Sequence, residues 1–279
     1  MRYKILAINP GSTSTKIAVF ENHNQIFTHT LRHSNEELSQ FEKISDQYEF
    51  RKNAIIKTLQ DNSIALDELS VIVGRGGLLR PIKSGVYEVN EKMVEDLKNG
   101  VSGEHASNLG GLIAANLAKE SGRCKAYIAD PVVVDELEPV ARISGHPLLP
   151  RVSIFHALNQ KAIAKMYANS EGQKYENLNL IVVHLGGGVS VGVHKEGRVV
   201  DVNNALNGEG PFSPERSGTL PALGLAEICF SGKYTFSQVK KMITGEGGLV
   251  AHLGTNSFNE VEKRVAEGDE KFSLISDAF

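Results

Sequence analysis

A short polar segment near the start of the chain carries the groups that bind phosphate. It reads Asn-Pro-Gly-Ser-Thr-Ser-Thr-Lys over residues 9–16. Hydroxyls, backbone N–H groups and an ammonium group bind phosphate oxygens when no bulky side chain stands between them. The segment differs from a P-loop, which needs a second glycine directly before the lysine and a helix after it. We therefore predict a phosphate-binding hairpin turn of another kind.

A second turn with similar potential lies far along the chain. Residues 180–193 read as an apolar strand, three consecutive glycines at Gly186, Gly187 and Gly188, and a second apolar strand. Glycines allow a backbone to approach a ligand closely and to adopt positive φ angles. We expect this turn to face a phosphate group as well.

The same order of elements surrounds both turns. Strand patterns at residues 3–8, 16–20 and 25–30 flank the first turn, and 197–203 reads as a third strand after the second turn. This repetition suggests a duplicated architecture, with two halves that enclose one nucleotide. A phosphate hairpin of this type points to the kinases and ATPases built like actin and hexokinase.

Composition limits the class of protein. The chain has 279 residues, 41% of them hydrophobic, and a formal net charge of −3, which gives no reason to expect nucleic acid or an anionic membrane as a partner. No apolar run approaches the roughly 18 residues of a membrane helix, and the start has no signal-peptide layout. Two cysteines make no disulfide framework, so we expect a reducing, cytoplasmic setting.

Strand and helix patterns alternate along the rest of the chain, which predicts an α/β fold. Further strands are expected at 70–73, 85–89 and 125–129. Helices are expected at 35–62, 91–98, 107–120, 154–168, 220–230, 236–243 and 259–266. The glycine-rich residues 245–248 are predicted to end a helix. The domain boundary is placed near residues 145–150, giving domains 1–147 and 148–279.

The last residues resemble the opening of an amphipathic helix. Residues 269–279 show no C-cap signal, and the second half holds fewer strands than the first. We therefore expect the second domain to be truncated. Its apolar side chains would then seek cover by dimerisation or aggregation.

Seven segments, taken in order, resemble the acetate kinase family of acyl phosphotransferases. They are residues 9–16, 74–81, 102–111, 129–136, 153–159, 183–190 and 210–221. The resemblance implies two duplicated ribonuclease H-like, or actin-like ATPase, domains. It also implies reversible phosphoryl transfer between a short-chain acyl phosphate and ADP with Mg²⁺, and a dimer or larger homo-oligomer. Members of the family continue beyond the point where this chain ends.

The resemblance also assigns residues to roles. Arg75 and Arg216 would hold the carboxyl group and the transferring phosphoryl group, and His156 would stabilise its charge. The remaining assignments are Asn9, Ser12, Ser14, Lys16, His184, Gly186, Gly187 and Gly188 for ATP or ADP, Asn9 and Asp130 for Mg²⁺, and Gly76, Gly77, His105 and Phe155 for the acyl pocket. By the same resemblance Asp130 would hold Mg²⁺ or orient the carboxylate substrate as a catalytic residue. It follows a strand directly, which is where ligands sit in α/β sheets.

Two departures from acetate kinases concern the substrate. Gly187 stands where those enzymes place an asparagine, and Gly76 and Gly77 stand where they carry bulky aliphatic residues. Smaller residues after Arg75 should enlarge the acyl pocket. Because each buried methylene contributes about 0.8 kcal/mol, two more carbons are worth about 1.6 kcal/mol, or roughly tenfold. The prediction is butyrate and branched four- or five-carbon acids over acetate.

Other interpretations remain open. A truncated, non-catalytic fragment would keep the fold and phosphate binding, and a sugar kinase would need a separate aspartate base. Either arginine could instead form a surface ion pair, Asp130 could cap a turn, and a lone histidine such as His156 is often structural. His184 is expected to hydrogen-bond within its sheet.

Overall fold

The computed structural model describes residues 2–279 and divides into two compact units, Met1–Val134 and Asp135–Phe279. Each unit is described by itself. The domain boundary predicted after residue 147 lies further along the chain and stays a prediction.

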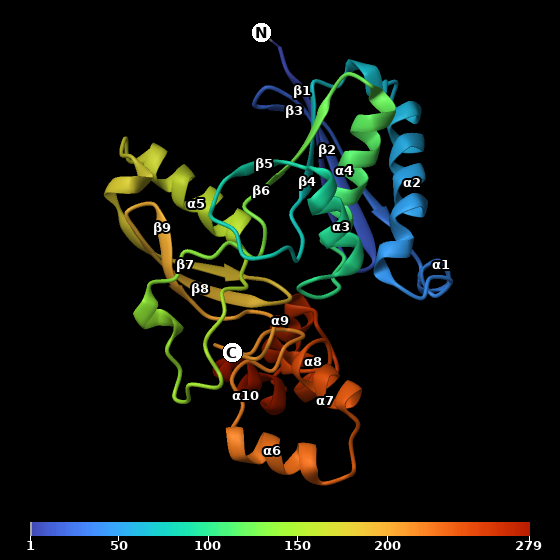
Figure 1. Ribbon diagram of the computed structural model, residues 1–279. Helices are drawn as coiled ribbons and strands as arrows, with labels where there is room; N and C mark the ends of the chain where they lie inside the picture. The colour runs from blue at the N-terminus through green and yellow to red at the C-terminus, as the bar shows by residue number, and fades with distance from the viewer. Residues whose placement is uncertain (1) are drawn as a thin grey trace. The chain divides into compact units, whose positions relative to one another are not determined.

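The first unit is built on a six-stranded sheet (Figure 1). Its strands are β1 (Lys4–Pro10), β2 (Ser14–Glu21), β3 (Asn24–Arg32), β4 (Val71–Arg75), β5 (Val86–Glu88) and β6 (Lys125–Ala129), in the order β3-β2-β1-β4-β6-β5. The first three strands form the predicted antiparallel meander. Strands β1, β4 and β6 are parallel, so their carboxyl ends meet at one edge.

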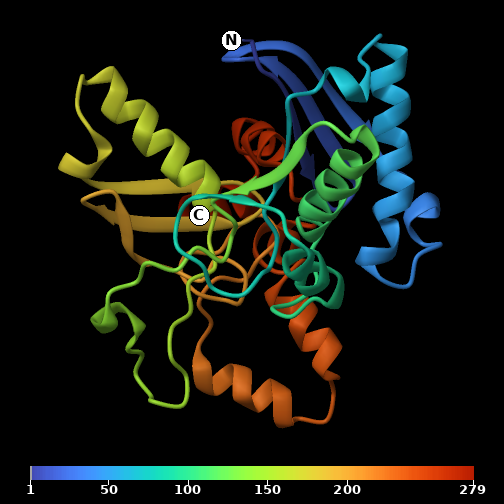
Figure 2. The ribbon, with the colours of Figure 1, turned by 45° about the horizontal axis from the view of Figure 1, so that its top comes forward.

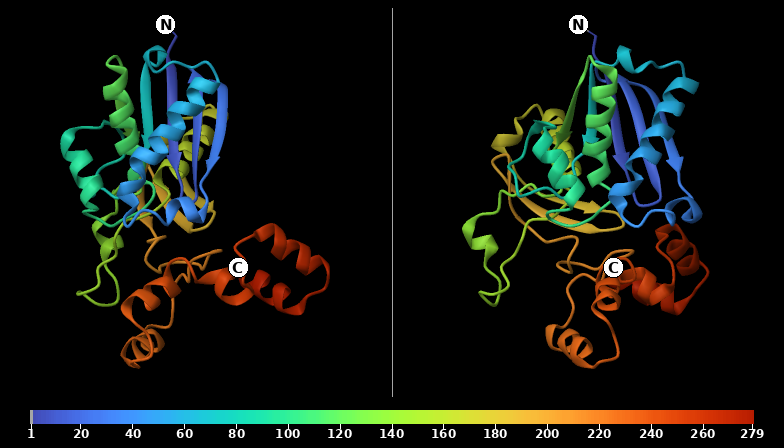
Figure 3. Two further views of the ribbon diagram at one scale, coloured as in Figure 1. Left: turned by 90° about the vertical axis from the view of Figure 1, so that its right-hand side faces the viewer. Right: turned by 45° about the vertical axis from the view of Figure 1, so that its right-hand side comes forward.

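Helices cover this sheet (Figure 3). They are α1 (Asn35–Leu38), α2 (Tyr48–Asp61), α3 (Glu91–Asn99) and α4 (Asn108–Ser121), with short 3₁₀ turns η1 (Ile44–Gln47) and η2 (Leu66–Glu68). Helix α4 packs on β4 and β6 and also contacts α2 and α3. Leu109, Leu112, Ile113 and Leu117 form the buried face of this helix. Asn90 caps α3, since its side chain accepts from the Met93 N–H.

The prediction of one helical segment over 35–62 is wrong in its middle. Residues 39–43 leave the helix between α1 and η1. The hydroxyl of Ser39 and the amide of Gln40 both donate to the Glu36 carbonyl, at 3.0 and 3.4 Å. These side chains compete with the backbone for a carbonyl that a continuing helix would use, which ends α1 after one turn.

The second unit opens with a helix and a three-stranded antiparallel meander (Figure 2). Strands β7 (Asn179–Leu185), β8 (Val189–Lys195) and β9 (Arg198–Val202) lie in that order, and α5 (Ala157–Ser170) packs on β7. The flanking 3₁₀ turns are η3 (Pro139–Arg142) and η4 (Tyr175–Asn177). The predicted duplication of strand, turn, strand and strand is therefore present, with three residues between the first two strands in each unit.

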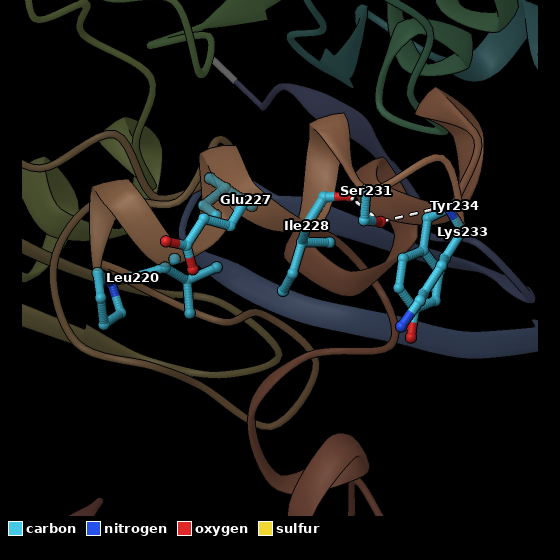
Figure 4. A pocket seen from close by; sticks show the side chains of 9 residues that line it. Leu220, Glu227, Ile228, Ser231, Lys233 and Tyr234 are labelled. Atoms are coloured by element: carbon cyan, nitrogen blue, oxygen red, sulfur yellow. Dashed lines mark hydrogen bonds between the residues drawn. The ribbon is translucent and has the colours of Figure 1, made fainter.

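Helices α6 (Ala222–Phe230), α7 (Phe236–Ile243), α8 (Gly248–Leu253), α9 (Phe258–Ala266) and α10 (Glu270–Ala278) complete the unit. Leu249, Val261 and Phe272 form a buried cluster among the last three. Helix α8 was not predicted: the glycine-rich turn separates α7 from it, and Gly248 begins it. Helix α6 has no buried residue, and Phe230 is 90% exposed. An open pocket of 630 Å³ lies between α6 and the segment that follows it (Figure 4).

No helix in residues 2–279 combines the length and apolar character that a membrane span requires.

A histidine is buried in the core of the second unit. His194 is fully buried, with Tyr175 Oη 2.6 Å from Nδ1 and Gln160 Oε1 3.0 Å from Nε2. Burial lowers the pKa of His194 to about 4, and the positive charge of Lys161 lowers it further. Lys161 is itself buried and pairs with Glu136 at 2.8 Å. His194 is therefore neutral in the folded protein at neutral pH.

We expect acid to destabilise this unit through His194. The ordinary pKa is 6.5 and the folded pKa about 4, so the folded state binds fewer protons between these values. The contribution of His194 to the free energy of unfolding is present above pH 6.5 and is lost as the pH falls through 4, about 3 kcal/mol in all. Urea unfolding at a series of pH values should show this slope. The slope should be smaller in His194→Gln and unchanged in a control variant of the exposed His23, His23→Gln. Equal slopes in all three proteins would contradict the expectation.

Candidate active site

The first group of predicted site residues lies at the carboxyl edge of the parallel strands. Ile8 pairs with Gly74, and Arg75 pairs with Ala129. Asn9 is therefore the last residue but one of β1, Arg75 ends β4, and Asp130 follows β6. Ligands in α/β sheets bind at this edge. The register of the sheet, which the sequence did not give, brings these three residues together.

Asn9 links Arg75 to the polar hairpin. Its Oδ1 accepts a hydrogen bond from Arg75 Nη1 at 3.2 Å. Asn9 also pairs directly with Lys16 across the hairpin, which places their side chains on the same face. Burial lowers the pKa of Arg75. A carboxamide, an ammonium group and a guanidinium group thus share one edge, which suits an anionic ligand.

The backbone of the polar turn is fixed by hydrogen bonds from Arg51 of α2. The Arg51 guanidinium is fully buried and donates to the carbonyls of Gly11, Ser12 and Ser14 at 2.7, 2.8 and 3.0 Å. Burial lowers the pKa of Arg51 to about 10, so it remains charged at neutral pH. Ser12 stays exposed and Ser14 half-buried. No pattern in the polar sequence of α2 pointed to Arg51.

A histidine completes this support. Thr15, fully buried, lies with its Oγ1 3.0 Å from His33 Nε2 and 3.2 Å from Arg51 Nη1. The backbone N–H of His33 donates to the Thr13 carbonyl at 2.9 Å. Burial, followed by the nearby Arg51 charge, lowers the pKa of His33. The turn is therefore fixed by a buried network, which preorganises it for a ligand.

Asp130 holds the neighbouring loop. Its Oδ1 accepts from Ser84 Oγ at 2.6 Å and from the Gly85 N–H at 2.9 Å. Asp130 has a positive φ of 37°, which is strained for a residue other than glycine and occurs often at functional sites. No further hydrogen bond of this carboxylate is found within residues 2–279, so Oδ2 retains capacity for a ligand. Both interpretations, turn capping and ligand binding, are compatible with this geometry.

The residues predicted for the acyl pocket in the first unit are tightly packed. A Cβ on Gly76 would lie 2.5 Å from Pro131 Cβ, and one on Gly77 would lie 2.5 Å from Asn108 Oδ1. His105 Nδ1 accepts from the Ser107 N–H at 3.2 Å. Close packing against Pro131 and Asn108 therefore accounts for both glycines, and a larger acyl pocket at this point stays a prediction.

The second group of predicted residues surrounds the glycine turn of the other unit. Ser213 Oγ donates to the Gly187 carbonyl at 2.7 Å and accepts from the Arg216 N–H at 3.1 Å. Arg216 Nη1 donates to the Ala205 carbonyl. A Cβ on Gly188 would lie 2.7 Å from Arg216 Cζ. Ser213, which the sequence reasoning missed, thus fixes Arg216 against the turn.

The prediction that the three glycines adopt positive φ angles is wrong. None of Gly186, Gly187 and Gly188 has a positive φ angle. The requirement at Gly188 is instead close approach, because the Arg216 side chain occupies the space of a Cβ. The turn was predicted from its composition, but Arg216, the residue whose position requires a glycine at 188, lies in another segment.

Two predicted histidines stack at the start of α5. The rings of His156 and His184 are 3.7 Å apart between centroids and inclined by 10°. His156 Nδ1 lies 2.9 Å from Ser190 Oγ, and His184 Nδ1 lies 2.9 Å from Asn159 Oδ1. His184 thus has a partner on α5, and the expected hydrogen bond within its sheet stays a prediction. Phe155, predicted to line the acyl pocket, is buried.

The residues predicted to hold Mg²⁺ fit that ion. Asn9 and Asp130 offer an amide oxygen and a carboxylate, and Mg²⁺ prefers oxygen ligands and usually adds waters and phosphate oxygens. Within residues 2–279 no three histidine, cysteine, aspartate or glutamate side chains gather as a metal cluster. The donor set matches an ion held by one or two protein ligands together with a bound phosphate chain.

Comparisons with known proteins establish the fold and the family of this chain. The chain superimposes on acetate kinase from Porphyromonas gingivalis with a TM-score of 0.77 at 16% identity, covering 99% of this chain and 76% of that one. A propionate kinase from Francisella tularensis gives a TM-score of 0.75 at 17% identity, covering 99% and 77%. These likenesses show that the chain shares the fold of these two proteins.

Sequence similarity is much higher to another set of relatives. Butyrate kinase 2 of Clostridium acetobutylicum is 60% identical over 96% of this chain and 75% of its own length. Butyrate kinase 1 of the same organism is 58% identical over 99% of this chain and 78% of its own. The acetokinase family model matches residues 148–279. The chain belongs to the acetokinase family, and it is a kinase.

Proposed function

We propose that this protein transfers a phosphoryl group between ATP and a short-chain carboxylate, with butyrate or a branched four- or five-carbon acid as the acceptor. The products are the acyl phosphate and ADP, and the reaction is reversible. The observation that carries the proposal is the 60% identity to a butyrate kinase across 96% of the chain. The clustered Asn9, Lys16 and Arg75, and the Arg216 side chain against the glycine turn, support it.

Each residue then has a physical task. Phosphoryl transfer depends on positioning and charge neutralisation rather than on covalent catalysis. The polar turn with Ser12, Ser14 and Lys16, and the turn at 186–188, would bind phosphate oxygens through backbone N–H groups, hydroxyls and an ammonium group. Arg75 and Arg216 would neutralise the transferring group and orient the carboxylate through planar donors.

The remaining groups act on the same reaction. His156 would donate a hydrogen bond to the phosphoryl oxygens, and His184 would hold its ring in place by stacking. Asn9 and Asp130 would hold Mg²⁺, which when bound neutralises charge on the phosphates. His105 and Phe155 are proposed to contact the acyl chain. A homo-oligomer and a cytoplasmic location are part of the proposal on family grounds.

Acyl hydroxamate formation tests this function. The 279-residue chain is incubated with ATP, Mg²⁺, hydroxylamine and one of butyrate, isobutyrate or acetate. We expect kcat/KM for butyrate to exceed that for acetate by roughly tenfold, because two more methylenes are buried. Arg216→Lys, which keeps the charge but loses the planar fork, should abolish most of the signal.

Other results would select an alternative. A better kcat/KM with acetate would reject the acyl preference. Phosphorylation of a hexose without any hydroxamate would favour a sugar kinase. Tight ATP binding with no turnover of any acceptor would favour the non-catalytic alternative.

A further inference from the structure

A chain of hydrogen bonds runs through the interior of the second unit and ends at His156. Tyr175 Oη lies 2.6 Å from His194 Nδ1, and His194 Nε2 lies 3.0 Å from Gln160 Oε1. Gln160 Nε2 lies 2.8 Å from Ser190 Oγ, which lies 2.9 Å from His156 Nδ1. The first four residues are buried, with at most 4% of Tyr175 exposed. Bulk water therefore cannot replace these partners.

The Ser190 carbonyl fixes the direction of the chain. Gln160 Nε2 lies 3.0 Å from that carbonyl oxygen as well as near Ser190 Oγ. Because a carbonyl only accepts, the amide group facing Ser190 must be the NH₂. Its two hydrogens go to the carbonyl and the hydroxyl of Ser190. The Gln160 oxygen therefore faces His194 Nε2, which must carry its hydrogen.

The same argument determines which ring nitrogen of His156 carries the proton. Ser190 Oγ accepts from Gln160, so its own hydrogen is available to donate, and His156 Nδ1 is within reach. The opposite direction would leave a fully buried hydroxyl hydrogen without an acceptor among the described residues, which is costly. We infer that Tyr175, His194, Gln160 and Ser190 form a directional relay that holds His156 as a neutral imidazole with its proton on Nε2.

The stacked histidine gives independent support. The rings of His156 and His184 lie 3.7 Å apart and nearly parallel. Two imidazolium charges at that separation repel strongly, so at most one ring can be cationic. His184 has the Asn159 side chain as a partner at 2.9 Å on Nδ1. A neutral His156 avoids the repulsion whatever the state of His184.

The consequence for catalysis rests on the proposed function. His156 would offer a neutral Nε2–H donor to the transferring phosphoryl group, and the full positive charges would come from the arginines. Ser190, Gln160 and His194 touch no substrate in this scheme. They are positioning residues that keep the proton on the nitrogen that faces the reaction.

The tautomer can be measured directly. Long-range ¹H–¹⁵N correlation spectra of the full chain labelled with ¹⁵N-histidine at pH 7 distinguish the two neutral tautomers and the imidazolium. The His156 signals are assigned by their loss in His156→Gln. We expect the Nε2–H pattern. An Nδ1–H pattern or a doubly protonated ring at pH 7 would overturn the inference.

Variants test the relay itself. Ser190→Ala should convert His156 to a mixture of tautomers and lower kcat about tenfold, with KM for ATP and for the carboxylate unchanged. Ser190→Thr, which keeps a hydroxyl, should restore the Nε2–H pattern. Ser170→Ala on the exposed end of α5 is the matched control and should change neither readout. An unchanged His156 spectrum in Ser190→Ala would reject the relay.

The two proposals fail separately. The spectra need no substrate, so an inactive protein with a neutral Nε2–H His156 would reject the carboxylate kinase function and leave the relay standing. An active protein in which His156 carries its proton on Nδ1 would support the carboxylate kinase function and reject the relay.

Discussion

Gly188→Ala should lower kcat about a hundredfold to a thousandfold and leave the protein folded. The added Cβ would overlap Arg216 Nη1 and lie 2.7 Å from Cζ, so the flexible guanidinium must move away. A single arginine that stabilises charge in phosphoryl transfer raises kcat roughly 10³-fold or more. Partial displacement of its guanidinium removes most of that effect. Because Gly188 has no positive φ, alanine fits the backbone. The readouts are kcat in the hydroxamate assay and the urea unfolding midpoint.

A glycine outside the proposed site supplies the control. A Cβ on Gly145 would meet no heavy atom within 4 Å, and Gly145 has no positive φ. Gly145→Ala should therefore retain kcat within a few-fold of the unmodified chain. If displacement of Arg216 is the cause, Gly188→Ala should add little to the defect of Arg216→Ala, because the two changes remove the same interaction. Full additivity of the two losses would show another cause.

Arg51→Met should destabilise the first unit and weaken nucleotide binding. The variant leaves the carbonyls of Gly11, Ser12 and Ser14 without their buried donor. At about 1 kcal/mol or more for each unsatisfied group, we expect a loss of about 3 kcal/mol in the free energy of unfolding. The turn would also lose its fixed shape and the positive charge behind it, so KM for ATP should rise at least tenfold. Urea unfolding and ATP titrations measure the two effects.

Two further variants separate charge from hydrogen bonding at this position. Arg51→Lys keeps the charge but cannot serve three carbonyls from a planar fork, so we expect an intermediate loss of stability. Arg123→Met, at an exposed arginine of the same unit, should change neither quantity. If Arg51→Met and Arg123→Met have the same free energy of unfolding and the same KM for ATP, Arg51 has no role in shaping the turn.

Local patterns in the sequence predicted most of the elements of this protein. The helix predicted at 236–243 coincides with α7, and the strand at 125–129 coincides with β6. Both depend on short-range features, namely the Thr235 cap of α7 and a short apolar run. The break at 39–43 was missed because side chains there compete for one carbonyl, which periodicity does not reveal.

The candidate site was predicted as separate residues and turns. Composition alone pointed to the polar turn at 9–16 and the glycines at 186–188, because phosphate binding needs small residues and donors at consecutive positions. Arg75, His156 and Arg216 came from resemblance to a family. Their partners Ser190 and Ser213 were not predicted. Ser190 lies on a different segment from His156, and Ser213 accepts from the Arg216 backbone N–H only because of the local shape of its loop.

The sequence by itself therefore determined the class of fold, both glycine- and hydroxyl-bearing turns, and the family, since these depend on residue types at close spacing. Only the tertiary structure placed Arg51 behind a turn 40 residues away in the chain and connected Ser190 to a histidine 34 residues away. It also showed that Gly188 has no positive φ angle and that the Arg216 side chain occupies the space of a Cβ there. Contacts of this kind depend on strand register and helix packing, which bring distant side chains together without leaving a local pattern in the sequence.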